Sequence, residues 1–358
     1  MATFAVTAEQ LSILPHSNAD ALELAVVGGY HAVVLKGQFR SGEYAIYIPE
    51  AALLPPELIE ELGLVGRLAG SAANRVKAIR LRGELSQGIV CRPSALASID
   101  LAAASLDRTD FAPALGIVKW VPEIPANMSG RVEATPELLT WIEIENIKRF
   151  PDLFTPGEAV TGTEKAHGSA TLISFSAQSD RLVVSSKGFG SRGLGLIEDE
   201  GNLYWRAVRV HDLEPKIRAM AAHLGVERLG VFGEVYGAGV QDLTYGLTSR
   251  NVPGFALFDA CYLDSTGKRR WIGQAELRAL ADEVGIPMVP EIYAGLYDYE
   301  AIAAAAEGPT VIGAGVHVRE GLVLRPRVER FDPASGDRVI AKFINPAYLL
   351  RKGGTEFD

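Results

Sequence analysis

Short apolar runs separated by turn residues make up most of the chain before residue 94. Such runs are typical of strands in small β-rich domains. The predicted strands are Leu24 to Val27, His31 to Leu35, Tyr44 to Ile48, Arg75 to Leu81 and Gly88 to Cys91. One helix is expected from Pro56 to Leu62, because proline begins that segment and Gly63 ends it. The pattern therefore predicts a small β-barrel.

Later in the chain the strands alternate with segments of helical periodicity. Strands are expected at residues 159–163, 171–175, 182–186, 229–237, 254–259, 320–325 and 338–344, and helices at 136–141, 214–224, 274–284 and 299–306. Residues 95–129 are rich in alanine and proline and lack periodicity, which indicates a linker region. Because 358 residues exceed what one core usually holds, we predict a barrel module at 1–115, a linker at 116–130 and a second domain at 131–358.

The charge distribution changes this picture locally. The chain carries 35 basic and 44 acidic residues, a net charge of −9, which argues against wholesale coating of nucleic acid. The stretch from Arg67 to Arg92, in contrast, holds six basic residues and one acid. On a strand Arg80 and Arg82 would point the same way, so with Arg75 and Lys77 they are candidates for contacting a phosphate backbone. The alternative is a solvated barrel edge that charge protects from aggregation.

The cysteines and the length of the apolar runs indicate the compartment in which the protein works. Cys91 and Cys261 lie far apart in apolar runs, which disfavours a disulfide framework and a zinc site, so we expect a cytoplasmic protein. No run of about 18 apolar residues is present, so no membrane partner is expected. Nothing in the sequence indicates an obligate protein partner.

The strongest candidate chemistry lies in the stretch Thr163-Glu164-Lys165-Ala166-His167-Gly168-Ser169-Ala170, between two predicted strands. A lysine becomes nucleophilic when burial or nearby positive charge lowers its pKa. Taken alone, this stretch is a weak signal, and a solvated loop lysine is the commoner explanation of it. The loop from Lys187 to Gly193 offers two cations that could approach phosphate, and Glu234 places a carboxylate within an apolar strand, where it needs a partner.

Five motifs follow one another in order: Lys165-Ala166-His167-Gly168, Phe232-Gly233-Glu234, Phe255-Ala256-Leu257-Phe258-Asp259, Glu320-Gly321-Leu322-Val323 and Ala341-Lys342-Phe343. This series resembles the motifs of the covalent nucleotidyltransferases, which include ATP-dependent DNA and RNA ligases and mRNA capping enzymes. The histidine in the first motif is closest to the RNA ligases. A barrel before the catalytic domain, with only 16 residues after Lys342, is similar to the Deinococcus-type RNA ligases. The resemblance implies an α+β fold in which an OB-like barrel precedes an antiparallel-sheet adenylyltransferase domain.

The resemblance also implies roles for individual residues. Lys165 would form a lysyl-AMP, and His167 would orient the phosphates and the departing pyrophosphate. The nucleotide would further contact Gly168 and Lys187, with Glu164 and Phe255 at adenine and Glu234 at the ribose. Glu320 would assist a divalent metal, Mg²⁺ or Mn²⁺, and Lys342 would neutralise the α-phosphate of ATP. The implied substrate is nicked or broken RNA, in duplex with DNA or RNA, with RNA on the 3′-hydroxyl side of a nick.

Two positions depart from the family pattern. RNA ligases often have asparagine where this chain has Ala170, and the last motif usually has a second lysine where Ile340 or Ile344 stands. Lys187 or Arg192 could supply that second cation. Two rival functions are kept open: a capping-type guanylyltransferase that uses GTP, and an inactive nucleic-acid-binding module.

Overall fold

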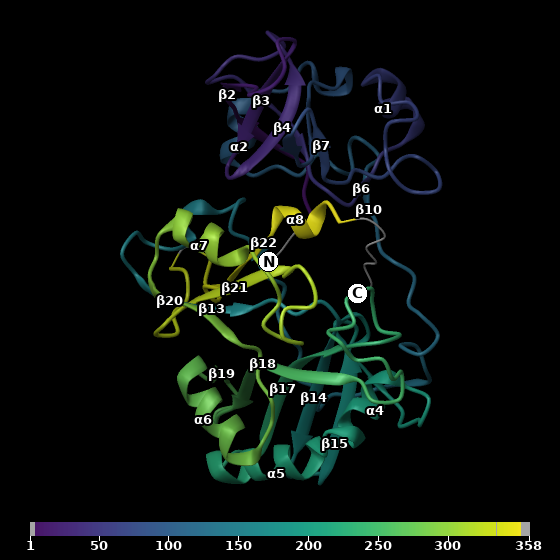
Figure 1. Cartoon of the computed structure of the whole chain (residues 1–358), viewed down its shortest axis with the longest axis vertical. Coiled ribbons are helices and arrows are strands. Elements are labelled where there is room, and N and C mark those ends of the chain that lie inside the picture. The colour runs from purple at the N-terminus through teal and green to yellow at the C-terminus, as the bar shows by residue number, and fades with distance from the viewer. Residues whose placement is uncertain (1–3, 334, 352–358) are drawn as a thin grey trace. The chain divides into compact units, whose positions relative to one another are not determined.

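The chain forms two compact units (Figure 1), and the computed structural model describes residues 4–333 and 335–351. The first unit consists of Met1–Val121 and Glu145–Leu153, and the second of Pro122–Ile144 and Phe154–Asp358. These limits differ from the predicted ones. The first part of the expected linker, residues 116–121, belongs to the first unit, where strand β10 (Val118–Lys119) pairs with β6 (Ala52–Leu53). Residues 145–153 return to that unit after the chain has already entered the second one.

The first unit is built from short antiparallel strands. One three-stranded sheet has the order β1 (Thr7–Gln10), β5 (Tyr44–Ile48), β9 (Ile89–Cys91), and another has β2 (Ser12–Pro15), β3 (Leu22–Val27), β4 (Tyr30–Leu35). A hairpin pairs β7 (Ile79–Leu81) with β8 (Glu84–Ser86). Helices α1 (Pro56–Glu61) and α2 (Leu101–Leu106) pack residues into the same apolar core as β5. Helix α1 begins at proline, as predicted, because that residue's missing N–H is not needed in the first turn.

A seven-stranded antiparallel sheet forms the larger layer of the second unit. Its order is β11 (Val132–Ala134), β16 (Leu194–Leu196), β15 (Arg181–Ser186), β14 (Ser169–Ser176), β17 (Arg228–Tyr236), β18 (Gly254–Leu263), β19 (Arg269–Trp271). Helices α4 (Leu203–Val210), α5 (Leu213–Leu224) and α6 (Gln274–Val284) cover one face and share its main apolar core (Figure 1). Glycines in the left-handed conformation, Gly225 and Gly285, end α5 and α6.

A second antiparallel layer lies in the same unit. Strands β22 (Ala341–Ile344), β21 (Gly321–Pro326), β13 (Ala159–Glu164) and β20 (Glu291–Leu296) lie side by side in that order. Helix α7 (Tyr299–Ala306) packs against it, and α8 (Pro346–Leu349) follows β22. Strands β13 and β14 are consecutive in the chain but belong to different sheets, so the connection between them joins the two layers. The predicted α+β fold with antiparallel sheets is confirmed.

Several local predictions were wrong. In the first unit, the strand predicted from Arg75 to Leu81 is confined to Ile79–Leu81. Three further errors lie in the second unit. In the described chain residues 136–141 form a turn and an extended segment instead of a helix, because Leu138 and Leu139 are buried against the sheet and the Leu139 N–H donates to Ser174 Oγ at 2.8 Å. The strand predicted at 338–344 is shorter, since Arg338 instead binds the buried Asp259. Within the glycine-rich stretch, Lys187–Gly190 forms one helical turn (α3), capped by Ser186 Oγ.

Cys91 and Cys261 are both buried free thiols in the described chain. Among the helices that the structure describes, none combines the length and apolar character that a membrane crossing requires.

Candidate active site

The loop that carries Lys165 lies where the two sheets of the second unit meet. It links β13 to β14, and its backbone is held by a hydrogen bond from the Lys165 N–H to the Gly321 carbonyl at 3.0 Å. The Lys165 side chain is 25% exposed, and its Nζ lies 2.7 Å from Oε1 of Glu320. The amine is thus accessible to a small molecule while a carboxylate fixes its position.

Glu234 faces this loop from the neighbouring strand. It lies directly across from Ala170 in the pairing of β14 with β17, and its carboxylate accepts a hydrogen bond from the Gly168 N–H. Burial raises the pKa of Glu234 to about 8, against the opposing effect of the Lys165 charge. A side chain at position 168 would overlap the Val235 carbonyl oxygen, which explains why glycine follows His167.

Lys342 completes a group of cations. It lies on β22 opposite Val323 of β21, and burial followed by the charges of Lys165 and Lys187 lowers its pKa to about 8. Like charges raise each other's energy unless an anion joins them. Three lysines held this close therefore form a site that favours a phosphate.

Lys187, one of the two candidates for a second cation, lies near the lysine and the carboxylate of the site. Its charge acts on both Glu234 and Lys342, and its Nζ forms a 2.8 Å ion pair with Glu143. Arg192, the other candidate, instead lies over the Phe189 ring at 5.1 Å from the ring centroid. Ile340 and Ile344 pack in small apolar clusters, so neither position leaves room for a charge.

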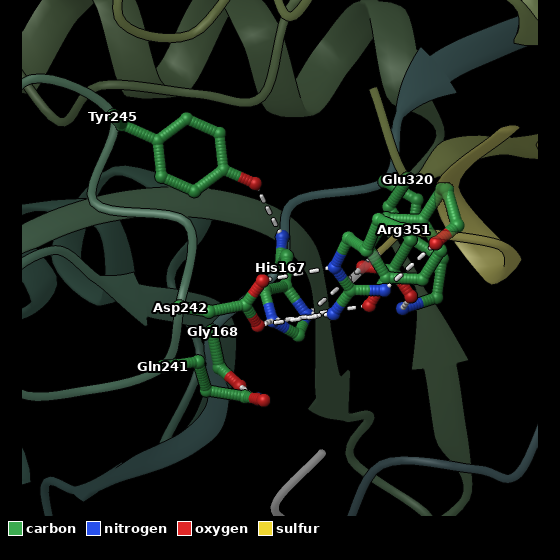
Figure 2. A network of polar contacts seen from close by, with 9 residues as sticks. His167, Gly168, Gln241, Asp242, Tyr245, Glu320 and Arg351 are labelled. Carbon is green, nitrogen blue, oxygen red and sulfur yellow. Dashed lines mark hydrogen bonds and ion pairs between the residues drawn. The ribbon is translucent and has the colours of Figure 1, made fainter. Parts of the chain in front are cut away.

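His167 is buried in a polar network at the end of the loop (Figure 2). Its Nε2 lies 2.8 Å from Oδ1 of Asp242, and its Nδ1 lies 2.8 Å from the Tyr348 hydroxyl and 3.7 Å from Oε2 of Glu320. Burial lowers the pKa of His167 below its usual value, although Glu320 and Asp242 act in the opposite direction. Asp242, Tyr348 and the nearby Arg351 were not found from the sequence, because no motif or periodicity marks them.

Glu164 is tied to the loop before β21. Its side chain is 1% exposed, and its Oε2 accepts hydrogen bonds from the Val311 and Ile312 N–H groups at 2.7 and 3.1 Å. Burial raises the pKa of Glu164. Its other carboxylate oxygen, Oε1, is buried and has no hydrogen-bond partner among the described residues, so it is available to a ligand donor.

The structure corrects the assignment of Phe255 as the residue that stacks on adenine. Phe255 is 1% exposed, pairs with Val235 and belongs to the helix-covered core, on the face of the sheet opposite to Glu234. A bulge at Phe232/Gly233 shifts the register, and Phe258 packs with Trp141 on the other face, with ring centroids 4.7 Å apart. Phe258 is half-buried and lies on the same face of the sheet as Glu234. Alternation along the strand separates Phe255 from Phe258, but it cannot tell which of the two faces the helices cover.

The basic stretch of the first unit is less regular than predicted. Arg82 lies outside β7 in a turn with φ of +50°, so it does not share a strand face with Arg80. The Arg80 guanidinium donates to the Gly83 carbonyl at 2.6 Å, and the Arg75 guanidinium stacks on Trp120 at 4.0 Å. Arg80 and Arg82 are exposed and Lys77 is partly exposed, so these three remain available to an anionic partner.

The site fits a divalent cation bound mainly through water and phosphate. Nowhere in residues 4–333 and 335–351 do three or more histidine, cysteine or acidic side chains gather as a metal cage. Glu320 Oε2, however, is buried and has no hydrogen-bond partner within the described chain. One such carboxylate oxygen, completed by substrate phosphates and water, matches how Mg²⁺ and Mn²⁺ are usually held.

Comparisons with known proteins agree with this geometry. An OB-fold domain model matches residues 5–93, and the RNA ligase family model matches residues 158–344. The chain is similar to the solved structure of Naegleria gruberi RNA ligase with pyrophosphate, at 25% identity and a TM-score of 0.78, covering 97% of this chain and 98% of that one. Variants of that enzyme with ATP and Mn and with AMP and Mn match at 23% and 24% identity, each with a TM-score of 0.77. These cover 96% and 97% of this chain, respectively, and 98% of each matched chain.

A search of curated proteins found no match. The amino-terminal OB-like module and the family predicted from the five motifs are confirmed. Because the RNA ligase model covers more than half of the chain, the protein belongs to the RNA ligase family.

Proposed function

We propose that the protein is an ATP-dependent ligase that joins a 3′-hydroxyl to a 5′-phosphate through a covalent lysyl-AMP on Lys165. One observation carries this proposal: a partly exposed lysine amine, 2.7 Å from Glu320, beside two further lysines whose charges repel it. Such an amine is positioned to attack phosphorus, and the surrounding cations favour a polyphosphate. The ATP-bound and AMP-bound structures of the Naegleria gruberi enzyme support ATP as the AMP donor.

The proposed reaction has three displacements at phosphorus. Lys165 Nζ loses its proton to solvent and bonds to the α-phosphorus of ATP, while the bond to the bridging oxygen breaks and pyrophosphate leaves. A 5′-phosphate oxygen then attacks the same phosphorus and releases Lys165, leaving an adenylylated end. Finally the 3′-hydroxyl attacks the 5′-phosphorus, loses its proton and expels AMP. Each displacement depends mainly on alignment and on neutralising developing charge.

The chain's own residues divide these tasks. Lys342 and Lys187 neutralise the transferred phosphate, and the Glu234 carboxyl binds the ribose hydroxyls. His167 orients the departing pyrophosphate. Phe258 replaces Phe255 as the proposed aromatic contact of adenine, and Oε1 of Glu164, which has no hydrogen-bond partner among the described residues, is the proposed acceptor for an adenine N–H.

Glu320 is the proposed protein ligand of Mg²⁺ or Mn²⁺. A divalent ion bound there would withdraw charge from the phosphate oxygens. Before the ion arrives, the same carboxylate pairs with Lys165, which keeps a buried charge compensated. We expect activity to be lost on treatment with a chelator and restored by either ion.

The substrate proposed for this site is a nick or break in RNA held in a duplex, with Arg80, Arg82 and Lys77 of the first unit contacting the backbone. The exposure of these side chains supports the proposal. Deletion of the amino-terminal residues would leave residues 145–153 without the rest of the first unit, to which they belong. Substitution is therefore the better test. Replacing all three by alanine should weaken nick binding and make it less salt-dependent, while labelling of Lys165 stays unchanged. Unchanged nick binding would contradict this role.

The covalent step is tested by incubating the protein with α-labelled ATP or GTP and Mg²⁺ or Mn²⁺, followed by denaturation. We expect label from ATP, lost in Lys165→Ala and retained in Lys216→Ala, whose lysine binds the carbonyls of His211 and Gly285 elsewhere. Label from GTP alone would identify a capping-type enzyme, and no label from either nucleotide would identify an inactive binding module. Label that persists in Lys165→Ala would refute the nucleophile.

A further inference from the structure

The segment Gln241–Tyr245, between β17 and β18, forms hydrogen bonds to the loop that carries Lys165 and His167 (Figure 2). The Gln241 amide donates to the Gly168 carbonyl, and the Tyr245 hydroxyl accepts the His167 N–H at 2.6 Å. Asp242 Oδ1 lies 2.8 Å from Nε2 of the His167 ring. Two contacts from this segment thus fix the backbone N–H and the ring of His167, and a third fixes the carbonyl of Gly168.

Tyr245 shows that this segment is held in a fixed shape. Its φ is +52°, a left-handed conformation that is unfavourable for an aromatic residue. Gly313 approaches so closely that a Cβ there would overlap the Tyr245 carbonyl oxygen. Strain of this kind persists only where the surrounding structure determines the conformation.

Two residues near the end of the described chain, Tyr348 and Arg351, also contact the His167 ring. The Tyr348 hydroxyl of α8 lies 2.8 Å from Nδ1 of His167. Arg351 binds Asp242 with two parallel hydrogen bonds, Nε to Oδ2 at 2.9 Å and Nη2 to Oδ1 at 3.0 Å, and its guanidinium lies 3.7 Å from the centroid of the Tyr348 ring. A bidentate pair of this geometry fixes a carboxylate more firmly than a single bond does.

These contacts fix the orientation of the His167 ring. Its Nε2 lies 2.8 Å from Oδ1 of Asp242 and 3.3 Å from Nη2 of Arg351, and its Nδ1 lies 2.8 Å from the Tyr348 hydroxyl. Because both ring nitrogens have partners, these partners determine the plane of the ring.

We propose that Asp242, Tyr348 and Arg351 are positioning residues that hold His167 ready for transfer of AMP to Lys165. The inference rests on the proposed function, and it assigns residues of the segment after β22 to the active site. None of the three residues needs to touch ATP. Their effect passes through His167, so it belongs to the step in which pyrophosphate leaves and not to the final sealing step.

The test compares these two steps in the full chain. The first is labelling of the protein by α-labelled ATP in single turnover, at several ATP concentrations. The second is sealing of a nick whose 5′ end already carries AMP, which bypasses lysine labelling. For Asp242→Asn and Tyr348→Phe we expect the labelling rate constant to fall about 10- to 100-fold, the range typical of outer-shell partners of functional histidines. Sealing of the adenylylated nick and the ATP concentration for half-maximal rate should each change less than about threefold.

Variants of Arg351 test whether its contact with Asp242 acts on His167. Arg351→Lys keeps the charge but loses the two-pronged geometry, so it should behave like Arg351→Ala. The double variant Asp242→Asn/Arg351→Ala should be no slower than Asp242→Asn alone, because both act through one ring. Arg330→Ala is the matched control: Arg330 makes a similar two-pronged pair with Glu158, with Nη2 at 2.8 Å from Oε2, away from Lys165.

The possible outcomes differ clearly. Slow labelling with normal sealing in the Asp242 and Tyr348 variants, and normal labelling in Arg330→Ala, would support the inference. Labelling within twofold of wild type in both variants would overturn it. Equal losses in both steps would also overturn it, since they would indicate general destabilisation. Absence of labelling in the wild-type protein would overturn the proposed function itself, and the positioning role with it.

Discussion

Removal of the Asp259 charge should cost about 3–5 kcal/mol of folding free energy, the cost of leaving buried charges without their partner. Asp259 of β18 is fully buried and pairs with Arg338 and with Arg325 of β21, whose side chains are each 2% exposed. Within the described residues, Nε and Nη1 of Arg325 have no hydrogen-bond partner. The Asp259 carboxylate therefore supplies most of the compensation for the buried Arg325 charge. This pair also connects the two sheets that carry the active site.

Asp259→Asn is the informative change because it keeps the side-chain size and an acceptor for the Trp141 indole N–H, which lies 2.9 Å from Oδ2. We would follow urea unfolding by tryptophan fluorescence, since Trp141 reports on the same contact. Glu198→Gln is the control: it breaks an ion pair with Arg209 whose side chains are 60% and 38% exposed, so the expected loss is below about 1 kcal/mol. A loss below about 1 kcal/mol for Asp259→Asn as well would refute the reasoning.

The pH dependence gives a second check on the same residue. Burial alone would raise the pKa of Asp259, but Arg338, Arg325 and the Trp141 hydrogen bond hold it below its usual value. The folded state therefore binds fewer protons than the unfolded state, and stability rises with pH in this window. The difference in unfolding free energy between wild type and Asp259→Asn should be at its full value above about pH 4. It should become smaller as the pH falls through the folded-state pKa of Asp259. A difference that stays constant down to acid unfolding would contradict the assignment.

Three further predictions concern the lysine cluster and its carboxylate. Gly168→Ala should abolish labelling by ATP, since its Cβ would overlap the Val235 carbonyl, and a normal labelling rate would show that the loop can move. Relative to Glu234→Gln, wild type should lose stability by an amount on the order of a few kcal/mol as pH rises from about 5 to 8, because a folded pKa of about 8 lies above the unfolded value; parallel urea midpoints would contradict this. Lys187→Ala should raise the pKa of Lys342, moving the alkaline limb of the labelling rate to higher pH, and an unmoved limb would remove Lys187 from the cluster.

Much of the second unit was predictable because its strands are continuous apolar runs bounded by turn residues. Strands β13, β14, β15 and β17 and helices α5, α6 and α7 lie within a few residues of where periodicity put them. The order of five motifs indicated the family, and family-model matches confirmed it. The roles of Lys165, Glu234 and Lys342 remain predictions that the geometry favours.

What only the tertiary structure decided are the contacts between residues far apart in the chain. The helices that cover one face of the seven-stranded sheet put Phe255 in the core and left Phe258 on the side of Glu234. Alternation separates these two side chains but cannot tell which face the helices will cover. The pairing of Asp242 with Arg351 joins positions 109 residues apart, and that of Tyr348 with His167 joins positions 181 apart. Local propensity and spacing specify elements, whereas such contacts depend on how the two sheets and the chain end pack together. The sequence by itself therefore indicated Lys165 as the candidate nucleophile, and the fold decided which side chains hold its neighbour His167 in place.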